Sequence, residues 1–484
     1  MREIGAILFV GWVMAAASVF AEELDSYRQR LTRLAERCES ESMPLEAEIT
    51  RRRLWENPSG AFILPRLSSR PQSALPDDAT DAQKRWFDDL RTIQTEESVR
   101  LWERAKELAR TGDGYGAFDM AACALFADPQ NESLRRLFGE RLDEGCWRTE
   151  YQIARRKAGE IDHPTFGFLP EENIPRYEAS ERFYRSRWMS ADEEARQRSK
   201  RNQPWVIETD HYRVSTTVSL EEGVRLGRLL EEFHRFWRLS FVRMTMTEKE
   251  AASFVLGRFE PKEKRHNVRV FRNREEYLAA ATRIDPTATV SSGGYLPSAA
   301  AIFIYVAENP DDTPLETMLF HEATHQLFAE SAATRKAAPR SEGLTAGLKS
   351  NYWAMEGIAV YLETFRVESD HCAVGGLQSF RLVRAAERAS EPGGLMLLER
   401  FTALGKEAFQ RDANLPALYT EAAGLTHFLF HADGGKYRAP FFELLLRVYL
   451  NRAEPDDLAR LCGLSFEELD ARLRDYLQNT PFVE

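Results

Sequence analysis

Two histidines and a glutamate lie close together in residues 320–326, which read FHEATHQ. In a helix, His321 and His325 lie one turn apart on the same face, so both imidazoles can bind one metal ion. Glu322 lies beside them and can take a proton from a water molecule on that ion. The pattern predicts a hydrolase that uses Zn²⁺ as its cofactor and Glu322 as its general base.

The residues before the motif predict the helix that it requires. Residues 313–316 read TPLE, which has the pattern of a capping box with proline at the first helical position. Apolar residues then recur at helical spacing and predict a buried side: Leu315, Met318, Leu319, Ala323 and Leu327. A buried helix can also hold histidines that only hydrogen-bond within the core, and this interpretation without a metal stays open.

A third metal ligand must come from elsewhere in the chain, because a catalytic zinc site takes three protein ligands and leaves one position open. Glu356 is the best candidate, since it lies in the apolar segment WAMEGIAVYLE, residues 353–363. A buried carboxylate needs a partner, and a metal ion compensates its charge directly. The alternative is a solvated glutamate on an exposed helix face.

The two segments together resemble the gluzincins of the peptidase MA superfamily, which combine HExxH with a glutamate ligand on a second helix. WAMEGIAVYLE is similar to the WLNEGFAxYxE element of the membrane-alanyl aminopeptidases, whose glutamate maps onto Glu356. The resemblance implies that His321, His325 and Glu356 bind zinc. The interval between His325 and Glu356 is longer than in those enzymes, and residues 329–350 have the composition of an inserted surface loop.

Tyr419 starts a further apolar helical segment, residues 419–429. In the aminopeptidases a tyrosine at a comparable distance beyond the glutamate ligand donates its hydroxyl to the oxyanion of the tetrahedral intermediate. The resemblance therefore implies this catalytic role for Tyr419, with an ordinary core tyrosine as the alternative. His427 and His431 are predicted to be packing or surface histidines, and Glu363 is a candidate for a carboxylate that orients the histidine ligands.

The chain lacks the GAMEN-type motif with which the aminopeptidases hold the free amine of their substrate. This difference argues against obligatory aminopeptidase activity and leaves endopeptidase cleavage, or no cleavage, open. Residues 293–297, GGYLP, instead lead into a predicted strand at residues 301–306. In zincins the edge strand at this place pairs with an extended substrate, so the expected partner is a peptide or a protein.

The wider pattern resembles a family of exported bacterial proteins of unknown function that contain a gluzincin-like domain. Besides the metal-binding segments, it includes WVIETDHYRV at residues 205–214 and a strand-like segment at 268–271 followed by REEY. The resemblance implies a fold and a metal site but no particular substrate.

We expect an α+β fold of the zincin type, in which a small sheet lies over the metal-binding helix and a helical lower half follows. The active site is expected in the cleft between these halves, and the chain after Ala329 is predicted to be nearly all helical. The predicted strands lie near residues 205–218, 267–272 and 300–306, and the predicted helices at 220–239 and 274–282.

The length of 484 residues predicts more than one domain. We expect a signal peptide at residues 1–21 and a helical N-terminal region at residues 22–144. An aromatic-rich connecting segment at residues 145–204 and a gluzincin-like domain at residues 205–484 are expected to follow. In the N-terminal region, predicted helices at 22–57 and 80–142 flank a Pro/Ser-rich stretch. The helical pair that ends at Asp128 resembles one tetratricopeptide-like hairpin.

An apolar run from Ile4 to Phe20 predicts a signal peptide that is cleaved after Ala21, and hence export to the periplasm or beyond. An uncleaved membrane anchor is the alternative, because Glu3 cancels the charge of Arg2 and weakens the signal-peptide pattern. The run is at the short end for spanning a bilayer, which disfavours this alternative. The net charge of −11 weighs against a nucleic-acid partner. The five cysteines include no CxxC pair, so neither a second zinc site nor a disulfide scaffold is predicted, although one bridge stays open.

Two other classes of function stay open. The first is a protein-interaction module in which the helical N-terminal region binds a partner and the zincin-like part is a catalytically silent scaffold. The intact Glu322 disfavours it, since loss of the base would be the simplest route to silence. The second is a structural zinc site, which would normally have a fourth Cys or His ligand near the motif. No feature of the sequence specifies an oligomeric state.

Overall fold

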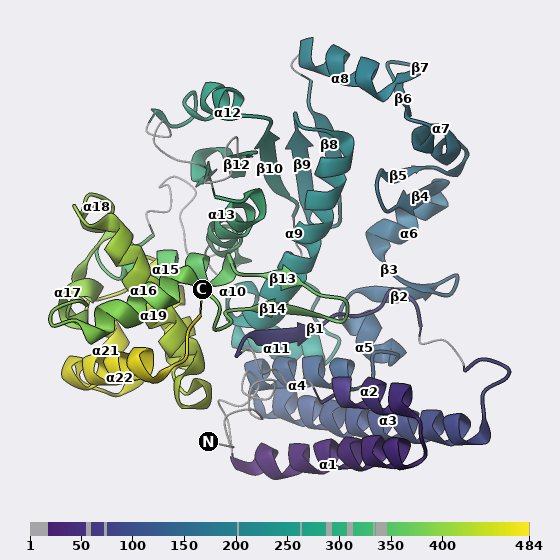
Figure 1. Ribbon diagram of the computed structural model, residues 1–484, viewed down its shortest axis with the longest axis horizontal. Coiled ribbons are helices and arrows are strands. Elements are labelled where there is room, and N and C mark those ends of the chain that lie inside the picture. The colour runs from purple at the N-terminus through teal and green to yellow at the C-terminus, as the bar shows by residue number, and fades with distance from the viewer. Residues whose placement is uncertain are drawn as a thin grey trace. The chain divides into compact units, whose positions relative to one another are not determined.

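The computed structural model describes residues 18–54, 60–71, 75–200, 203–261, 264–286, 293–306, 313–332, 334 and 346–483 (Figure 1). It has the mixed α+β composition that the sequence predicts. The chain forms two compact units: unit 1 contains residues 1–147, 238–261 and 345–484, and unit 2 contains residues 148–237 and 262–344. The predicted signal peptide lies outside the described residues except for residues 18–21, which begin the first helix. Among the described residues, no helix is both long enough and apolar enough to cross a bilayer.

Unit 2 contains a mixed sheet with the strand order β11-β12-β10-β9-β8. The central strands β9, β10 and β12 are parallel, whereas β8 and β11 pair antiparallel with their neighbours. The bounds are β8 Trp205–Glu208, β9 Tyr212–Thr216, β10 His266–Phe271, β11 Gly293–Leu296 and β12 Ala301–Tyr305. The strands predicted near 205–218, 267–272 and 300–306 are confirmed, because alternating or continuous apolar residues there bury one or both faces.

The helices of unit 2 that matter for the site are α9 Leu220–Ser240, α12 Arg274–Ala281 and α13 Leu315–Ala329. The helix α13 packs on β11 and β12, and its Phe320 stacks on Phe233 of α9 at a centroid distance of 5.1 Å. The predicted capping box at residues 313–316 is wrong. Pro314 is the N-cap with an extended backbone, ψ 142°, and the helix begins only after it, so Thr313 lies outside the capping position.

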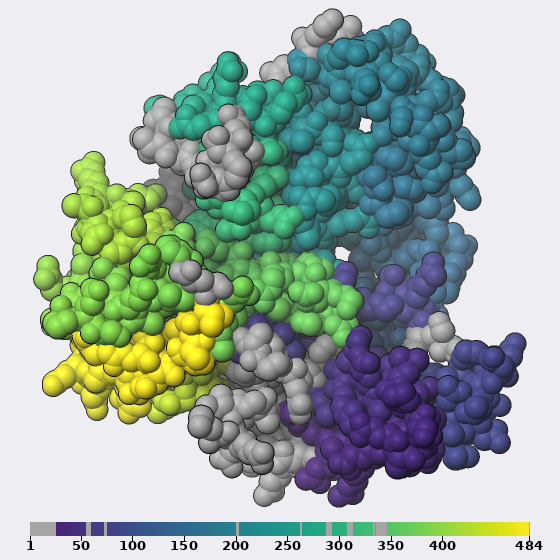
Figure 2. Space-filling view, viewed as in Figure 1, coloured from purple at the N-terminus to yellow at the C-terminus, as the bar shows by residue number. Residues whose placement is uncertain are grey.

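The connecting segment contains a repeat that the sequence analysis missed. A β-hairpin followed by a short helix occurs three times in succession, and residues 148–200 form a continuous part of the surface in Figure 2. The modules are β2 Glu140–Asp143, β3 Cys146–Thr149 and α6 Glu150–Lys157; β4 Glu160–His163, β5 Gly167–Pro170, η2 Glu171–Asn173 and α7 Ile174–Glu178; and β6 Glu181–Tyr184, β7 Arg187–Ser190 and α8 Ala191–Lys200.

The same pair of contacts connects each module to the helix before it. An arginine of that helix forms an ion pair with the glutamate that opens the next hairpin, five residues later: Arg135–Glu140, Arg155–Glu160 and Arg176–Glu181. Each guanidinium also lies over an aromatic ring of the following strand, at 5.0 Å from Trp147, 5.5 Å from Phe168 and 3.9 Å from Trp188. The aromatic residues of this segment therefore order it by packing against arginines as well as against apolar neighbours.

The N-terminal part of unit 1 is helical. Its elements are α1 Ser18–Ser40, α2 Pro44–Arg52, α3 Asp81–Thr111, α4 Gly114–Ala127 and α5 Glu132–Leu137. The helices α3 and α4 pack against each other across a turn at Gly112, which has a φ of 97°. The helix α11, Glu248–Val255, packs on α4 at Gly114. A β-carbon at this position would lie 1.9 Å from the Glu248 carbonyl oxygen, so there is no room for a side chain here.

The C-terminal part of unit 1 is helical, with one exception to the prediction. The strands β13 Arg366–Val367 and β14 His371–Val374 form a three-stranded sheet with β1 Phe62–Pro65. Local periodicity could not reveal this pairing, since its two partners lie far apart in the chain. The remaining elements of unit 1 are α10 Val242–Thr245, α15 Tyr352–Leu362, α16 Phe380–Ser390, α17 Leu398–Ala403, α18 Lys406–Gln410, α19 Leu415–His431, η5 Ala432–Gly435, α20 Arg438–Tyr449, α21 Asp457–Cys462 and α22 Phe466–Asn479. The predicted loop at 329–350 falls mostly outside the described residues.

Candidate metal centre

The helix α13 presents the two motif histidines on one face. The rings of His321 and His325 are half-buried, with centroids 5.0 Å apart and planes at 78°. The other face of the helix is anchored in the core of unit 2, because Leu319, Ala323 and Leu327 are fully buried. The apolar spacing that predicted the helix therefore also fixes the direction in which both imidazoles point.

Glu322 contacts the strand that precedes the motif. Its Oε2 accepts a hydrogen bond from the backbone N–H of Tyr295 in β11, at 2.7 Å. β11 lies at one end of the described sheet and pairs with β12 along its other side. One carboxylate oxygen of the predicted general base is thus held by the backbone of an edge strand.

The helix α15 carries Glu356 in a buried position. Only 4% of this residue is exposed, and the adjacent Gly357 explains how the helix comes so close to α19. A β-carbon at Gly357 would lie 2.2 Å from the Thr426 hydroxyl oxygen, so a glycine is required after the glutamate. The alternative of a solvated glutamate on an exposed helix face is wrong.

Tyr352 lies one helical turn before Glu356 and was not predicted as a site residue. Burial, and then the charge and hydrogen bond of the Glu356 carboxylate, raise the pKa of Tyr352 well above its ordinary value. The Tyr352 hydroxyl also accepts a hydrogen bond from Gln410 Nε2 at 2.9 Å. Gln410 thus holds the Tyr352 hydroxyl near Glu356, where it could orient the carboxylate. The signal in the sequence was the i, i+4 spacing of a tyrosine and a glutamate in an apolar helix.

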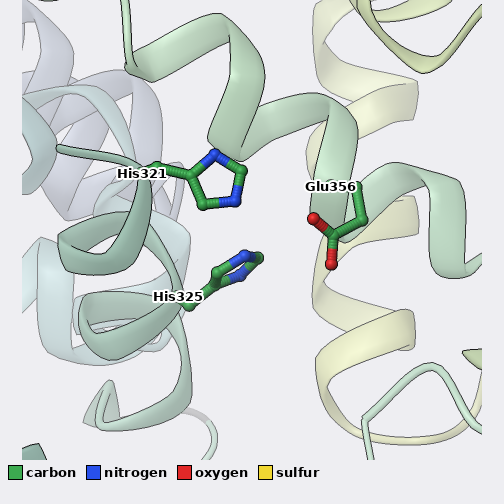
Figure 3. A group of neighbouring side chains, drawn as sticks. All are labelled: His321, His325 and Glu356. Atoms are coloured by element: carbon green, nitrogen blue, oxygen red, sulfur yellow. The ribbon is translucent and has the colours of Figure 1, made fainter. Parts of the chain in front are cut away.

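His321, His325 and Glu356 each offer one ligand atom, and these three atoms lie within 4.8 Å of one another. Figure 3 shows the two rings and the carboxylate pointing toward a common space. Two imidazoles and one carboxylate are the donor set of one class of catalytic zinc site. A tetrahedral ion with bonds of about 2 Å separates its ligand atoms by roughly 3.3 Å, so small side-chain adjustments would bring the three onto one ion. The residues therefore fit a zinc ion.

Tyr419 lies in the second turn of α19, which begins four residues earlier than predicted, at Leu415 before Pro416. Its ring is half-buried, meets Phe409 edge-on at 5.7 Å, and packs on the cluster of Val360, Leu382 and Ala423. Core packing thus accounts for part of its environment, and its role as an oxyanion donor stays a prediction.

Three other residues named from the sequence have clear environments in unit 1. Glu363 is the C-cap of α15 and lies 3.3 Å from Arg381, and its predicted role toward the histidines stays a prediction. His427 is buried and stacks on His431 at 4.2 Å, and burial lowers the pKa of His427 to about 3. The prediction that these two histidines serve packing is confirmed.

No protein-family model matches the chain, and no curated protein matches it in sequence. The functional assignment therefore depends on the residues of this chain and their geometry.

Proposed function

We propose that the chain is a zinc-dependent hydrolase that cleaves peptide bonds, with a gluzincin-like fold. The observation that carries this proposal is the convergence of His321, His325 and Glu356, whose ligand atoms lie within 4.8 Å of one another. The motif supplies a carboxylate, Glu322, immediately beside the first histidine. Together these residues provide three metal ligands and a base, which is the minimum set for metal-assisted hydrolysis.

Each residue has a distinct role in the proposed reaction. A zinc ion held by the three ligands would polarise the scissile carbonyl and lower the pKa of a water molecule to about 7. Glu322 accepts the proton of that water molecule and returns it to the leaving amine. The backbone N–H of Tyr295 donates to Glu322 Oε2, and Oε1 is proposed as the oxygen that exchanges the proton. Tyr419 is proposed to donate its hydroxyl to the oxyanion.

The substrate is proposed to be an extended peptide or protein segment that pairs with β11, Gly293–Leu296. The absence of a GAMEN-type motif from the sequence favours internal cleavage over removal of N-terminal residues. Export is proposed from the apolar run at residues 4–20.

The test combines metal analysis with cleavage of casein, an unstructured protein substrate. We expect one zinc ion per wild-type chain and hydrolysis that Glu322→Ala abolishes while zinc is retained. Glu356→Ala should lose both zinc and activity. Glu316→Ala is the matched control, because Glu316 lies in the same helix but is half-exposed and pairs with Arg225.

Two outcomes would contradict the proposal. Purified wild type without stoichiometric zinc would overturn the metal site. Wild type that holds zinc but hydrolyses casein no faster than Glu322→Ala would favour the catalytically silent scaffold.

A further inference from the structure

The first hairpin–helix module binds a segment of its own chain. This segment belongs to the Pro/Ser-rich stretch after β1 and forms neither helix nor strand at this place. The backbone N–H of Trp147 in β3 donates to the Ser69 carbonyl oxygen at 2.6 Å, and Nη2 of Arg135 donates to the Ser68 carbonyl oxygen at 3.0 Å. One strand and one guanidinium thus bind two successive backbone carbonyl groups.

The third module repeats this pair of donors at the same spacing. Arg135 precedes Trp147 by 12 positions, and Arg176 precedes Trp188 by 12 positions. Each tryptophan is the second residue of its strand, after a two-residue turn in which both residues have positive φ. Because alternate N–H groups of an antiparallel strand point away from the partner strand, Trp188 directs its N–H out of the hairpin as Trp147 does. Within the described residues β7 pairs only with β6, so no strand lies beside this N–H.

The arginine of the third module lacks the cover that the first one has. The Arg135 side chain is 0% exposed, whereas the Arg176 side chain is 42% exposed. Arg176 donates Nε and Nη2 to the two carboxylate oxygens of Glu181, at 2.6 and 3.2 Å, and its Nη1 has no hydrogen bond to any residue that the structure describes. One nitrogen of the guanidinium is therefore open to a further acceptor.

Both donors of the third module are held in place without a partner. The paired hydrogen bonds to Glu181 fix the guanidinium of Arg176, which also lies 3.9 Å from the centroid of the Trp188 ring. The backbone of the same tryptophan carries the other donor. Donors that are ordered in advance lose less entropy when a ligand binds, which favours recognition of a flexible segment.

We propose that the third module binds a segment of another polypeptide chain that forms neither helix nor strand. The Trp188 N–H and Arg176 Nη1 donate to two successive carbonyl oxygens of that segment, as the corresponding groups do in the first module. Such a segment offers successive carbonyl oxygens that helical or sheet hydrogen bonds have not already used. The second module does not repeat the spacing, because its longer turn places Phe168 13 positions after Arg155.

The first experiment measures peptide binding to the full chain. The probe is a fluorescein-labelled peptide, LPRLSSRP, which copies residues 64–71, and the protein carries Glu322→Ala so that the proposed hydrolysis cannot consume it. We expect saturable binding by fluorescence anisotropy and slower hydrogen–deuterium exchange at residues 187–190. Exchange at residues 146–149 should not change, because Trp147 already donates to Ser69. No saturation up to about 1 mM peptide, or slower exchange at residues 146–149 alone, would overturn the proposal.

The second experiment removes the guanidinium. Arg176→Ala should keep a thermal unfolding midpoint close to that of its parent, since the side chain is partly exposed, and should bind the peptide roughly 10-fold more weakly. Arg196→Ala is the matched control, because Arg196 is an exposed arginine of the same module that pairs with Glu193 at 3.1 Å. It should bind within about twofold of the parent protein. Equal affinities in the two variants would refute the role of Arg176. Neither experiment needs zinc or cleavage, so their outcome is separate from that of the proposed function.

Discussion

The Tyr352 hydroxyl accepts a hydrogen bond from the amide of Gln410 at 2.9 Å, and Glu356, one turn further along α15, is near enough to raise the pKa of Tyr352. A partner of this kind orients a metal ligand and restricts the conformations that its side chain can adopt. Tyr352, Gln410 and Glu356 all belong to unit 1, so Tyr352 is a candidate for a residue that orients Glu356.

Removal of this partner should weaken the metal site without removing a ligand. We expect Tyr352→Phe to lower zinc affinity roughly 10- to 100-fold, as measured by competition with a chromogenic chelator. Tyr437→Phe is the control and should keep wild-type affinity, because Tyr437 is a fully buried tyrosine of unit 1 whose hydroxyl donates to Asp433 instead. Equal zinc affinity in Tyr352→Phe and wild type would show that the hydroxyl does not orient the ligand.

Zinc removal should destabilise the folded chain. An ion that binds only the folded state stabilises it by mass action, so a chelator should lower the thermal unfolding midpoint of wild type, and added zinc should restore it. Glu356→Ala should start at the lower midpoint and respond to neither treatment. The idea fails if differential scanning fluorimetry gives the same midpoint for wild type with and without chelator.

The stacked pair His427 and His431 should make stability depend on pH. Burial holds the pKa of His427 at about 3 in the folded protein and lowers the pKa of His431 in the same direction. The unfolded chain therefore binds more protons than the folded chain between about pH 6.5 and 3. The contribution of these two neutral histidines to the free energy of unfolding is fully present above about pH 6.5. It is lost as the pH falls from there toward about 3.

His427→Gln tests this dependence, because glutamine does not titrate. Urea unfolding at pH 7 and pH 4.5 should show that wild type loses roughly 2–3 kcal/mol more than the variant on acidification. His371→Gln, a more exposed histidine 2.7 Å from Asp370, serves as the control. If His427→Gln and wild type lose the same stability, the buried imidazole is not responsible.

The arginine contacts of the hairpin–helix modules should differ in their contribution to stability. Arg135 is fully buried and also donates to the carbonyl oxygens of Pro129 and Ser68, so its loss removes three polar contacts and the packing of a buried side chain. We expect Arg135→Ala to destabilise unit 1 by about 2–4 kcal/mol in urea unfolding. Arg176, which makes the equivalent pair with Glu181 at the surface, should cost far less when changed to alanine. Similar losses for both variants would contradict this difference.

The sequence predicted the elements with strong local patterns. The strand at 301–305 has five consecutive buried residues, and the motif helix α13 has an apolar side at regular spacing, so both were found. The proposed third ligand, Glu356, was found because a carboxylate in an apolar helix needs a partner. Such arguments use only neighbours in sequence.

The features that were missed depend on contacts between distant segments. β1 and β14 pair although they lie far apart in the chain, and the backbone amide of Tyr295 donates to Glu322 from a different element. No periodicity marks such a contact. The hairpin–helix repeat was missed for another reason: its modules share a glutamate and an aromatic position but little else, and the middle hairpin has a longer turn.

The spacing within these modules has a consequence for the length of the chain. Arg155 pairs with Glu160 and Arg176 pairs with Glu181, each five positions later. If Ala158 were joined directly to Ser180, Glu181 would come to lie five positions after Arg155. A whole module can therefore be removed, or added, with every join still carrying an arginine and a glutamate in register. A change in the length of this segment by one whole module would thus keep this ion pair at every join.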